Sequence, residues 1–456
     1  MKGLNLTLPP GGFNRDVRFT APRPLRRNAA TRWRTSLCAL SAGLLLGCAT
    51  AGGEECVRVV SWADYRELAL EQEVVDSLHV KHPEIPVCLE SLEGAGIYRE
   101  KVLTSIAAGA APGVFLLDGI DAPAFIEAGV LLDLAPYLPR VGVDLDAFHP
   151  RLTELFAPGG HAWGIPKGFT PMVIYYNRTV FDEAGVAYPA ADWSWEQFRA
   201  TARALTRDTD RDGEVDVWGF GWPREFFYLQ GWLWSGGGEL LSPDGTRASG
   251  YLDSPRSIDA LRFYLDLAVR DSVAPRVELF RRGSGITSTR LFHANRLGML
   301  QSGHWAMRTY REHEQAGRLR YGVVPLPRRA GVPPVTVLYS SAWAVPASAP
   351  HRRWNVQVAA FMGSATAQRI RSRGELELPG LVAVSEAVAA RDTTGRERAF
   401  LAAAEHGRQS WGTRVRKWRE VQDLLLDLLD RPFVRGDDPA VVARELARRI
   451  DRILAP

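Results

Sequence analysis

Cys56-Val-Arg-Val-Val60 and Ile85-Pro-Val-Cys88-Leu89 are two apolar, β-branched segments, and each is typical of a strand. Between them, the stretch from Tyr65 to His82 has apolar residues at helical spacing. A strand, a helix and a second strand in this order predict a β-α-β unit in which the two strands are parallel neighbours.

The same alternation of strands and helices continues along the chain. Further strands are expected at 113–118, 172–176 and 335–346. Helices are expected at 98–108, at 122–129, at 195–206 with Ser194 as the N-cap, at 257–270, at 353–362 and over most of 398–453, with breaks at Pro432 and 436–439. This order predicts an α/β fold, in which ligands bind beyond the carboxyl ends of parallel strands.

The first 47 residues have the properties of an export leader. Basic residues precede an uncharged apolar run, 37–46, which ends at Gly47-Cys48 and is too short to span a bilayer. This ending resembles the bacterial lipobox, in which the cysteine is lipidated and becomes the N-terminus. We therefore expect residues 1–47 to be a lipoprotein signal peptide and leader. Cys48 would then anchor an exported protein to the membrane, on its periplasmic or extracellular face. An ordinary signal peptide or a buried N-terminal helix is the alternative.

Removal of the leader changes the charge and the cysteine content. The leader has eight basic residues and one acidic residue, so the formal net charge of +4 becomes about −3, and a nucleic-acid partner is not expected. Cys38 leaves with the leader and Cys48 carries lipid, which leaves Cys56 and Cys88 in an oxidising compartment. Because these two cysteines lie in neighbouring strands, a disulfide is the expectation and two buried thiols are the alternative.

An ordered series of short motifs carries a family resemblance. It includes His82-Pro-Glu-Ile-Pro-Val87, Gly164-Ile-Pro-Lys167, Tyr175-Tyr-Asn-Arg178 and Gly303-His-Trp305. The remaining motifs lie at 98–109, 112–118, 129–138, 181–185, 193–198, 322–327 and 341–346. Taken in order from about residue 57 to about residue 450, the series resembles the extracellular solute-binding proteins of the sugar-binding type, the group that contains maltose-binding protein.

The resemblance implies a two-lobed periplasmic-binding-protein fold of the α/β class, with interleaved segments and a hinge between the lobes. One lobe is expected at 57–168 plus 337–382 and the other at 172–335 plus 385–456, with crossings near 167–171, 336–340 and 379–384. It also implies a monomeric receptor that captures a sugar, an oligosaccharide or a polyol between the lobes. The receptor would deliver this ligand to the permease of an ABC importer and would need no cofactor.

The chemistry of sugars indicates which residues contact the ligand. Sugars have apolar C–H faces and hydroxyl groups, so their sites need flat aromatic side chains and well-placed polar ones. The resemblance places stacking residues at Trp305 and Trp411, with Trp232 and Trp234 as the next candidates, and a core position is the alternative for each. The other candidates follow expected strands, open a helix or lie near the expected hinge: Trp62, Asp64, Tyr65, Tyr98, Asp118, Lys167 and Arg308.

An acidic loop has the spacing of a calcium site. Asp208, Asp210, Asp212 and Asp216 occupy its first, third, fifth and ninth positions, and a glycine occupies the sixth. The twelfth position is Gly219, so the usual bidentate glutamate is missing. A structural calcium ion and a solvated turn are therefore both retained as interpretations.

Catalysis is the main alternative class of function. The sequence has no Gly-x-Ser-x-Gly elbow, no His-Glu-x-x-His pair and no phosphate-binding glycine-lysine loop. An exported carbohydrate-active enzyme with two facing carboxylates stays as one alternative. A sensor that presents its ligand without transport is the other.

Overall fold

The predicted β-α-β unit is present at the start of the described chain. The computed structural model describes residues 56–92, 95–223, 225–275 and 287–455. Strands β1 (Val57–Ser61) and β2 (Val87–Ser91) are parallel neighbours, and α1 (Tyr65–Lys81) connects them. The signal peptide and Cys48 lie outside the described residues.

Local sequence explains where α1 begins and which face it buries. The Asp64 carboxylate accepts hydrogen bonds from the backbone N–H groups of Arg66 and Glu67, and the Glu67 carboxylate accepts one from the N–H of Asp64. This capping box satisfies three backbone donors at the first turn. Val74 and Leu78 of α1 are buried in a core with β1 and β3.

The first sheet has the strand order β10-β4-β9-β3-β1-β2, and β11 pairs with the first residues of β9. The strands β3 and β4 pair antiparallel with β9, whereas β1, β2 and β3 are parallel to one another. The other strands of this sheet are β3 (Val114–Asp118), β4 (Ile165–Pro171), β9 (Thr336–Ala344), β10 (Leu378–Pro379) and β11 (Gly407–Gln409). Both faces of this sheet are buried, because separate apolar clusters cover them.

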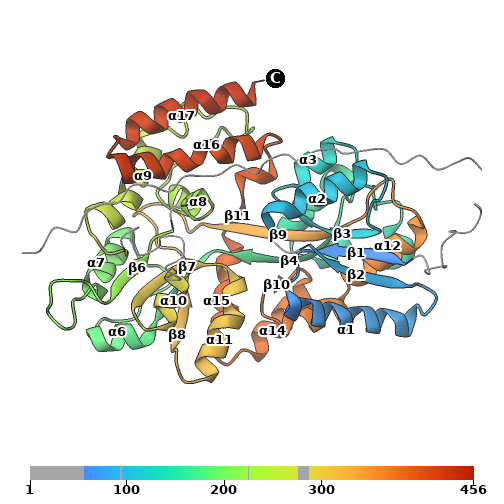
Figure 1. Ribbon diagram of the computed structural model, residues 1–456, viewed down its shortest axis with the longest axis horizontal. Coiled ribbons are helices and arrows are strands. Elements are labelled where there is room, and N and C mark those ends of the chain that lie inside the picture. The colour runs from blue at the N-terminus through green and yellow to red at the C-terminus, as the bar shows by residue number, and fades with distance from the viewer. Residues whose placement is uncertain (1–55, 93–94, 224, 276–286, 456) are drawn as a thin grey trace, which may run out of the picture. The chain divides into compact units, whose positions relative to one another are not determined.

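The second sheet has the order β6-β7-β5-β8 (Figure 1). Its strands are β5 (Val173–Asn177), β6 (Trp218–Gly221), β7 (Leu297–Ser302) and β8 (Tyr321–Val324). In Figure 1, α16 and α17 lie side by side and cover α8 and α9, and these helices contribute to the core of the second sheet.

The helices that the sequence predicted lie within a few residues of their expected bounds, whereas several other helices were not predicted. Ser194 caps α7 with a capping box, as predicted. The α-helices after α1 are α2 (Ala95–Ala107), α3 (Ala122–Glu127), α4 (Leu138–Val141), α5 (Pro150–Phe156), α6 (Arg178–Ala184), α7 (Trp195–Leu205), α8 (Phe226–Ser235), α9 (Pro255–Val269), α10 (Ser288–His293), α11 (Met307–Gln315), α12 (Arg352–Met362), α13 (Ala365–Ser372), α14 (Val382–Arg391), α15 (Arg396–Glu405), α16 (Trp418–Asp430) and α17 (Pro439–Leu454). Short turns of other helix types are η1 (Leu145–Ala147), η2 (Pro158–Gly160), η4 (His304–Ala306), η5 (Trp411–Thr413) and η6 (Arg431–Arg435).

The expectation of nearly continuous helix near the C-terminus is wrong in one place. Between α15 and α16 the chain forms β11 and η5, because Gly407–Gln409 pairs with Thr336–Leu338 of β9. This pairing is a tertiary contact that no local pattern encodes. The expected breaks at Pro432 and near Gly436 are present.

The chain crosses between the two sheets through segments that bond to each other. It passes from β4 to β5 at Met172 and returns from β8 to β9 before Thr336. The Met172 N–H donates to the Val337 carbonyl oxygen over 3.1 Å, and Thr336 Oγ1 donates to the Met172 carbonyl oxygen over 2.5 Å. Helix α14, which follows β10, contacts the start of α5, since His149 Nε2 lies 2.8 Å from Ser385 Oγ.

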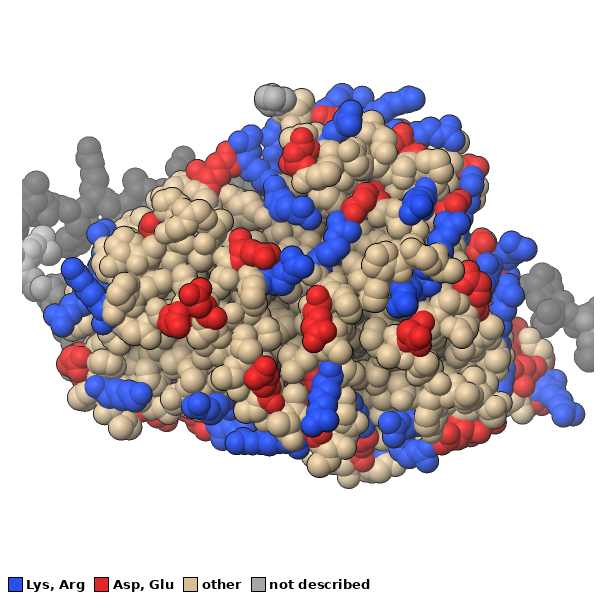
Figure 2. Space-filling view, turned by 180° about the vertical axis from the view of Figure 1, so that it is seen from behind, with Lys and Arg blue, Asp and Glu red and all other residues tan. Residues whose placement is uncertain are grey.

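Two further observations concern the surface. Among the described residues, no helix combines the length and the apolar character that a membrane crossing requires. Figure 2 shows basic and acidic side chains interspersed across one face of the described chain. This pattern differs from the continuous basic surface that typifies nucleic-acid binding.

Cys56 and Cys88 form a disulfide between β1 and β2, with their Cα atoms 5.7 Å apart. We predict that Cys56→Ser/Cys88→Ser lowers the free energy of unfolding by about 3 to 4 kcal/mol, because the bridge closes a loop of about 30 residues in the unfolded chain. Urea unfolding of the wild-type protein and of the double variant measures this difference in free energy. Labelling of both thiols in the unreduced protein would contradict the bridge itself.

Candidate functional site

A cavity of about 360 Å³ lies where β1 and β3 end and where β4 and β9 approach the second sheet. The carboxyl ends of parallel strands are the usual place for ligands in α/β proteins. The residues that line it are Trp62, Glu67, Asp118, Ile120, Lys167, Phe169, Thr170, Phe227, Trp305, Tyr339, Ser340, Ser341, Leu376 and Glu377. We refer to this cavity as the cleft.

Aromatic side chains from three elements form one side of the cleft. The rings of Phe227 and Tyr339 are stacked, with centroids 4.1 Å apart and an interplanar angle of 12°. The ring of Trp305 lies 5.9 Å from that of Phe227 and is partly exposed. Because the Tyr339 hydroxyl donates to the Phe227 carbonyl oxygen over 2.9 Å, the stacked pair is held in place.

The position of Trp305 is fixed by buried contacts of its neighbours. Nε2 of the buried His304 lies 2.9 Å from a carboxylate oxygen of Glu397, and the His304 N–H donates to Thr170 Oγ1 over 2.6 Å. Residue 303 must be glycine, since a Cβ there would lie 2.2 Å from the Trp305 ring. Trp305 is therefore a rigid platform.

Charged side chains also line the cleft. The Lys167 ammonium, which is buried, lies 2.5 Å from a carboxylate oxygen of Glu377. Burial alone would lower the pKa of Lys167, but the carboxylates of Glu377, Glu67 and Glu71 outweigh it and raise that pKa. Burial raises the pKa of Glu67, although Lys167 counteracts the effect. Carboxylates thus outnumber cations in this part of the cleft.

Asp118 is the carboxyl group with the least compensation. Burial, and then the like charge of Asp121, raise its pKa to about 6, while a hydrogen bond from the Ile120 N–H over 3.0 Å and the charge of Arg419 lower it. At neutral pH the group is charged in a partly buried site. A ligand hydroxyl group that donates to the Asp118 carboxylate would replace the hydrogen bonds to water that burial removes.

The structure brings four of the sequence-predicted residues together in the cleft: Trp62, Asp118, Lys167 and Trp305. Asp64 and Arg308 do not line it. Instead they form an ion pair of 3.0 Å between α1 and α11, and a second pair, Arg66 with Glu312 at 2.5 Å, joins the same two helices. Exposed pairs of this kind contribute little to stability.

The remaining predicted residues lie elsewhere. Tyr65 is 70% exposed, and Tyr98 is buried, where its hydroxyl donates to the Val60 carbonyl oxygen and accepts from the Leu116 N–H. Trp232, Trp234 and Trp411 belong to the core of the second sheet, with exposures of 0%, 2% and 1%. The Nε1 group of Trp232 donates to Gln301, and that of Trp234 donates to Glu239.

Of the charged, serine and threonine residues that line the cleft, sequence reasoning predicted Asp118 and Lys167 and missed the other five. Glu67, Ser340, Ser341 and Glu377 were not among the predicted site residues, and neither were Phe227 and Tyr339. A signal did exist for Glu67, because it is the partner of Asp64 in the capping box and so lies at the end of β1.

The acidic loop has three clustered carboxylates. Oxygens of Asp208, Asp210 and Asp216 lie within 4.8 Å of one another, whereas Asp212 is outside this group. The Asp208 carboxylate accepts from the N–H groups of Arg211 and Gly213, as in a tight solvated turn. Calcium binding stays a prediction.

Comparisons with known proteins agree with this geometry. The model of the family described as bacterial extracellular solute-binding protein matches residues 65–369. An ABC substrate-binding protein of Listeria monocytogenes, solved in complex with cycloalternan, has 22% identity and a TM-score of 0.77, covering 87% of this chain and 98% of that chain. UgpB of Mycobacterium tuberculosis, solved with glycerophosphocholine, has 20% identity and a TM-score of 0.73, covering 88% of this chain and 99% of that chain. An uncharacterized lipoprotein of Streptomyces antibioticus is 31% identical over 172 residues, which is 36% of this chain and 37% of the relative. The two-lobed α/β fold predicted from the sequence is confirmed.

We predict that Asp118→Asn stabilises the protein at neutral pH. The pKa of Asp118 is raised from 3.8 in the unfolded chain to about 6 in the folded protein. Below pH 3.8 the group is protonated in both states and does not change the free energy of unfolding. As the pH rises from 3.8 through 6, the charged form lowers the stability of the folded protein. The substitution should therefore raise the free energy of unfolding at pH 7.5 by at most about 3 kcal/mol, with a difference that shrinks toward pH 4. Urea unfolding at both pH values measures this, and lower stability of the variant at pH 7.5 would contradict it.

Proposed function

Because this chain belongs to the family of bacterial extracellular solute-binding proteins, we propose that it captures a sugar, an oligosaccharide or a polyol in the cleft and delivers it to an ABC permease. The observation that carries the proposal is that the aromatic rings of Trp305, Phe227 and Tyr339 line the same cavity as the carboxylates of Glu67, Asp118 and Glu377. An aromatic face packs against sugar C–H groups, and a carboxylate accepts from hydroxyl groups.

The charges of the cleft favour a neutral ligand over an anionic one. Lys167 is engaged by Glu377, and Asp118 and Glu67 have raised pKa values because their charges are poorly compensated. A phosphate ester would add negative charge beside these carboxylates, at a cost that grows as the site closes. The relative solved with cycloalternan supports an oligosaccharide, whereas the relative solved with glycerophosphocholine represents the less favoured class.

The mechanism would use the crossings between the sheets as a hinge. We propose lobes at 57–168 plus 337–382 and at 172–335 plus 385–456, which close over the ligand by rotation about Met172 and Thr336. The ion pairs between α1 and α11 join the two proposed lobes, and such exposed pairs would stabilise the closed form only slightly. The permease would recognise that form, and ATP hydrolysis would occur on another subunit.

The ligand class and the platform are tested together. In a thermal-shift screen of glycans and polyols, a ligand at 100 times its dissociation constant should stabilise the protein by about 2.7 kcal/mol. Trp305→Ala should weaken binding of that ligand by about 1 to 4 kcal/mol and leave the unliganded melting temperature nearly unchanged. Trp411→Ala, the matched control, should instead lower the free energy of unfolding by about 3 to 5 kcal/mol, because it empties a core position.

The same samples distinguish the proposal from its alternatives. Chromatography of the recovered glycan should show it intact, and cleavage products would identify a carbohydrate-active enzyme. Unchanged affinity in Trp305→Ala would refute the cleft as the ligand site. A sensor would bind as a transport receptor does, but deletion of its gene would leave uptake of the ligand intact.

We also propose that the protein is a lipid-anchored monomer on the periplasmic or extracellular face of the membrane. Support comes from the leader that ends at Cys48 and from the partial likeness to a Streptomyces lipoprotein. Cys48→Ala should shift the protein from the membrane fraction to the medium or periplasm, because stable anchoring requires acyl chains. Identical fractionation and intact mass for both proteins would argue against lipidation. No cofactor is needed, and calcium at Asp208, Asp210 and Asp216 remains a prediction beside this function.

A further inference from the structure

A second cavity, of about 540 Å³, lies apart from the cleft and shares none of its lining residues. Helices α3 and α5 form one side, and β11 together with the turn after it forms the other. Its basic lining residues are Arg151, Arg408 and Arg414, and Glu154 is its acidic one. The volume is in the range of small-molecule sites.

Two of these arginines are held in place by buried tryptophans. The Arg408 guanidinium carbon lies 4.2 Å from the centroid of the Trp234 ring, and that of Arg414 lies 4.5 Å from the centroid of Trp411. Stacking on a rigid ring reduces the entropy that an arginine loses when it binds a ligand. The tryptophans that the sequence suggested as ligand platforms thus support arginines instead.

The charge of Arg414 is poorly compensated. Arg408 has a carboxylate partner, Glu239, at 2.7 Å, and Arg151 has Glu154 at 3.4 Å. Among the described residues, no carboxylate forms an ion pair with Arg414. Burial and then the charge of Arg408 lower the pKa of Arg414, whereas the charge of Glu239 raises it by less, so the net shift is against the charged form.

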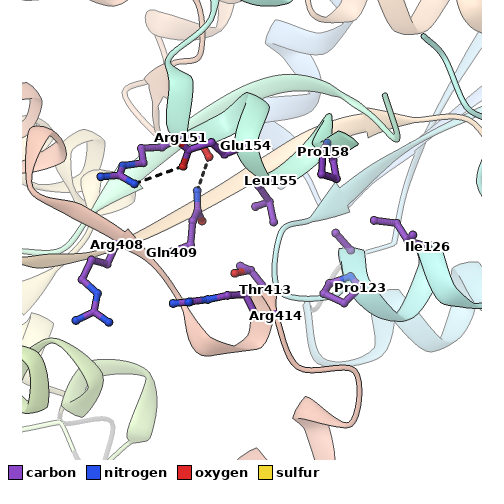
Figure 3. Close-up of a pocket in the computed structure, with 11 residues that line it drawn as sticks. Pro123, Ile126, Arg151, Glu154, Leu155, Pro158, Arg408, Gln409, Thr413 and Arg414 are labelled. Carbon is purple, nitrogen blue, oxygen red and sulfur yellow. Dashed lines mark hydrogen bonds and ion pairs between the residues drawn. The ribbon is translucent and has the colours of Figure 1, made fainter. Parts of the chain in front are cut away.

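The cavity has a cationic end and an apolar end. Figure 3 shows the guanidinium groups of Arg151, Arg408 and Arg414 extending toward one end, while Pro123, Ile126 and Pro158 lie at the other. The Gln409 side-chain amide donates to the Arg151 carbonyl oxygen over 2.9 Å and so joins the two sides.

We propose that this cavity is a second binding site, for a ligand that has a phosphate or carboxylate group attached to an apolar part. The anionic group would bind between Arg414, Arg408 and Arg151, where guanidinium groups offer paired donors. The apolar part would pack against Pro123 and Ile126. This site has the opposite charge preference to the cleft and does not depend on the identity of the cleft ligand.

The test is calorimetric titration of the purified full chain with phenyl phosphate and with benzoate, and with phenol as the neutral control. We expect saturable binding of at least one anion and no measurable binding of phenol. Arg414→Ala should weaken anion binding at least about 10-fold, because a charge-assisted pair is lost, and Arg414→Lys should recover only part of it. Arg416→Ala is the matched control, since Arg416 pairs with Glu127 and does not line the cavity.

Preference for phenyl phosphate or for benzoate identifies which anionic group the site takes, and either preference supports the site. The proposal fails if neither anion binds below about 10 mM or if phenol binds as well as they do. It also fails if Arg416→Ala weakens binding as much as Arg414→Ala does. Loss of anion binding in Trp305→Ala would locate the anion in the cleft and would likewise overturn the second site.

Discussion

The pairing of β9 with three other strands is the constraint on which the cleft depends. One edge of β9 bonds to β4 over Leu338 to Trp343, while the other edge bonds to β11 at its start and to β3 at its end. Between β11 and β3, residues Tyr339 and Ser340 are left without a strand partner on that edge, and both line the cleft. A strand that is fixed at both ends can present side chains to a ligand between them without the mobility of a loop.

The sequence predicted those parts of the scaffold that rest on local patterns. The β-α-β unit, the capped start of α7 and the breaks near Pro432 each depend on residues that lie next to one another in the chain. Strand β11 could not be predicted, because its three residues become a strand only by pairing with β9, some seventy residues earlier. Local propensity says nothing about such a partner.

The site was harder to predict than the fold, since residue type does not distinguish a platform from a core. Trp305 lines the cleft, whereas Trp232 and Trp411 are enclosed by other aromatic and aliphatic side chains of the second lobe. Trp305 differs from them in its neighbouring backbone, because Gly303 has no side chain and leaves room for the Trp305 ring. Gly168 has a similar role on β4. A Cβ at residue 168 would lie 2.5 Å from the carboxylate carbon of Glu377, so glycine allows Glu377 to approach the strand. Such steric conditions appear only once the strands are packed.

The charges of the cleft also follow from this packing. Lys167 lies on β4, so it is buried with Glu377 whether or not a ligand is present, and Asp118 ends β3 at a point where burial already raises its pKa to about 6. Burial of such charged groups lowers the stability of the folded chain. Because both aromatic rings and carboxylate acceptors line the cleft, a ligand fits best when its hydroxyl groups donate to the carboxylates and its C–H groups pack on the rings. A polyhydroxylated, uncharged ring meets both conditions, whereas an anionic group would add negative charge beside these carboxylates.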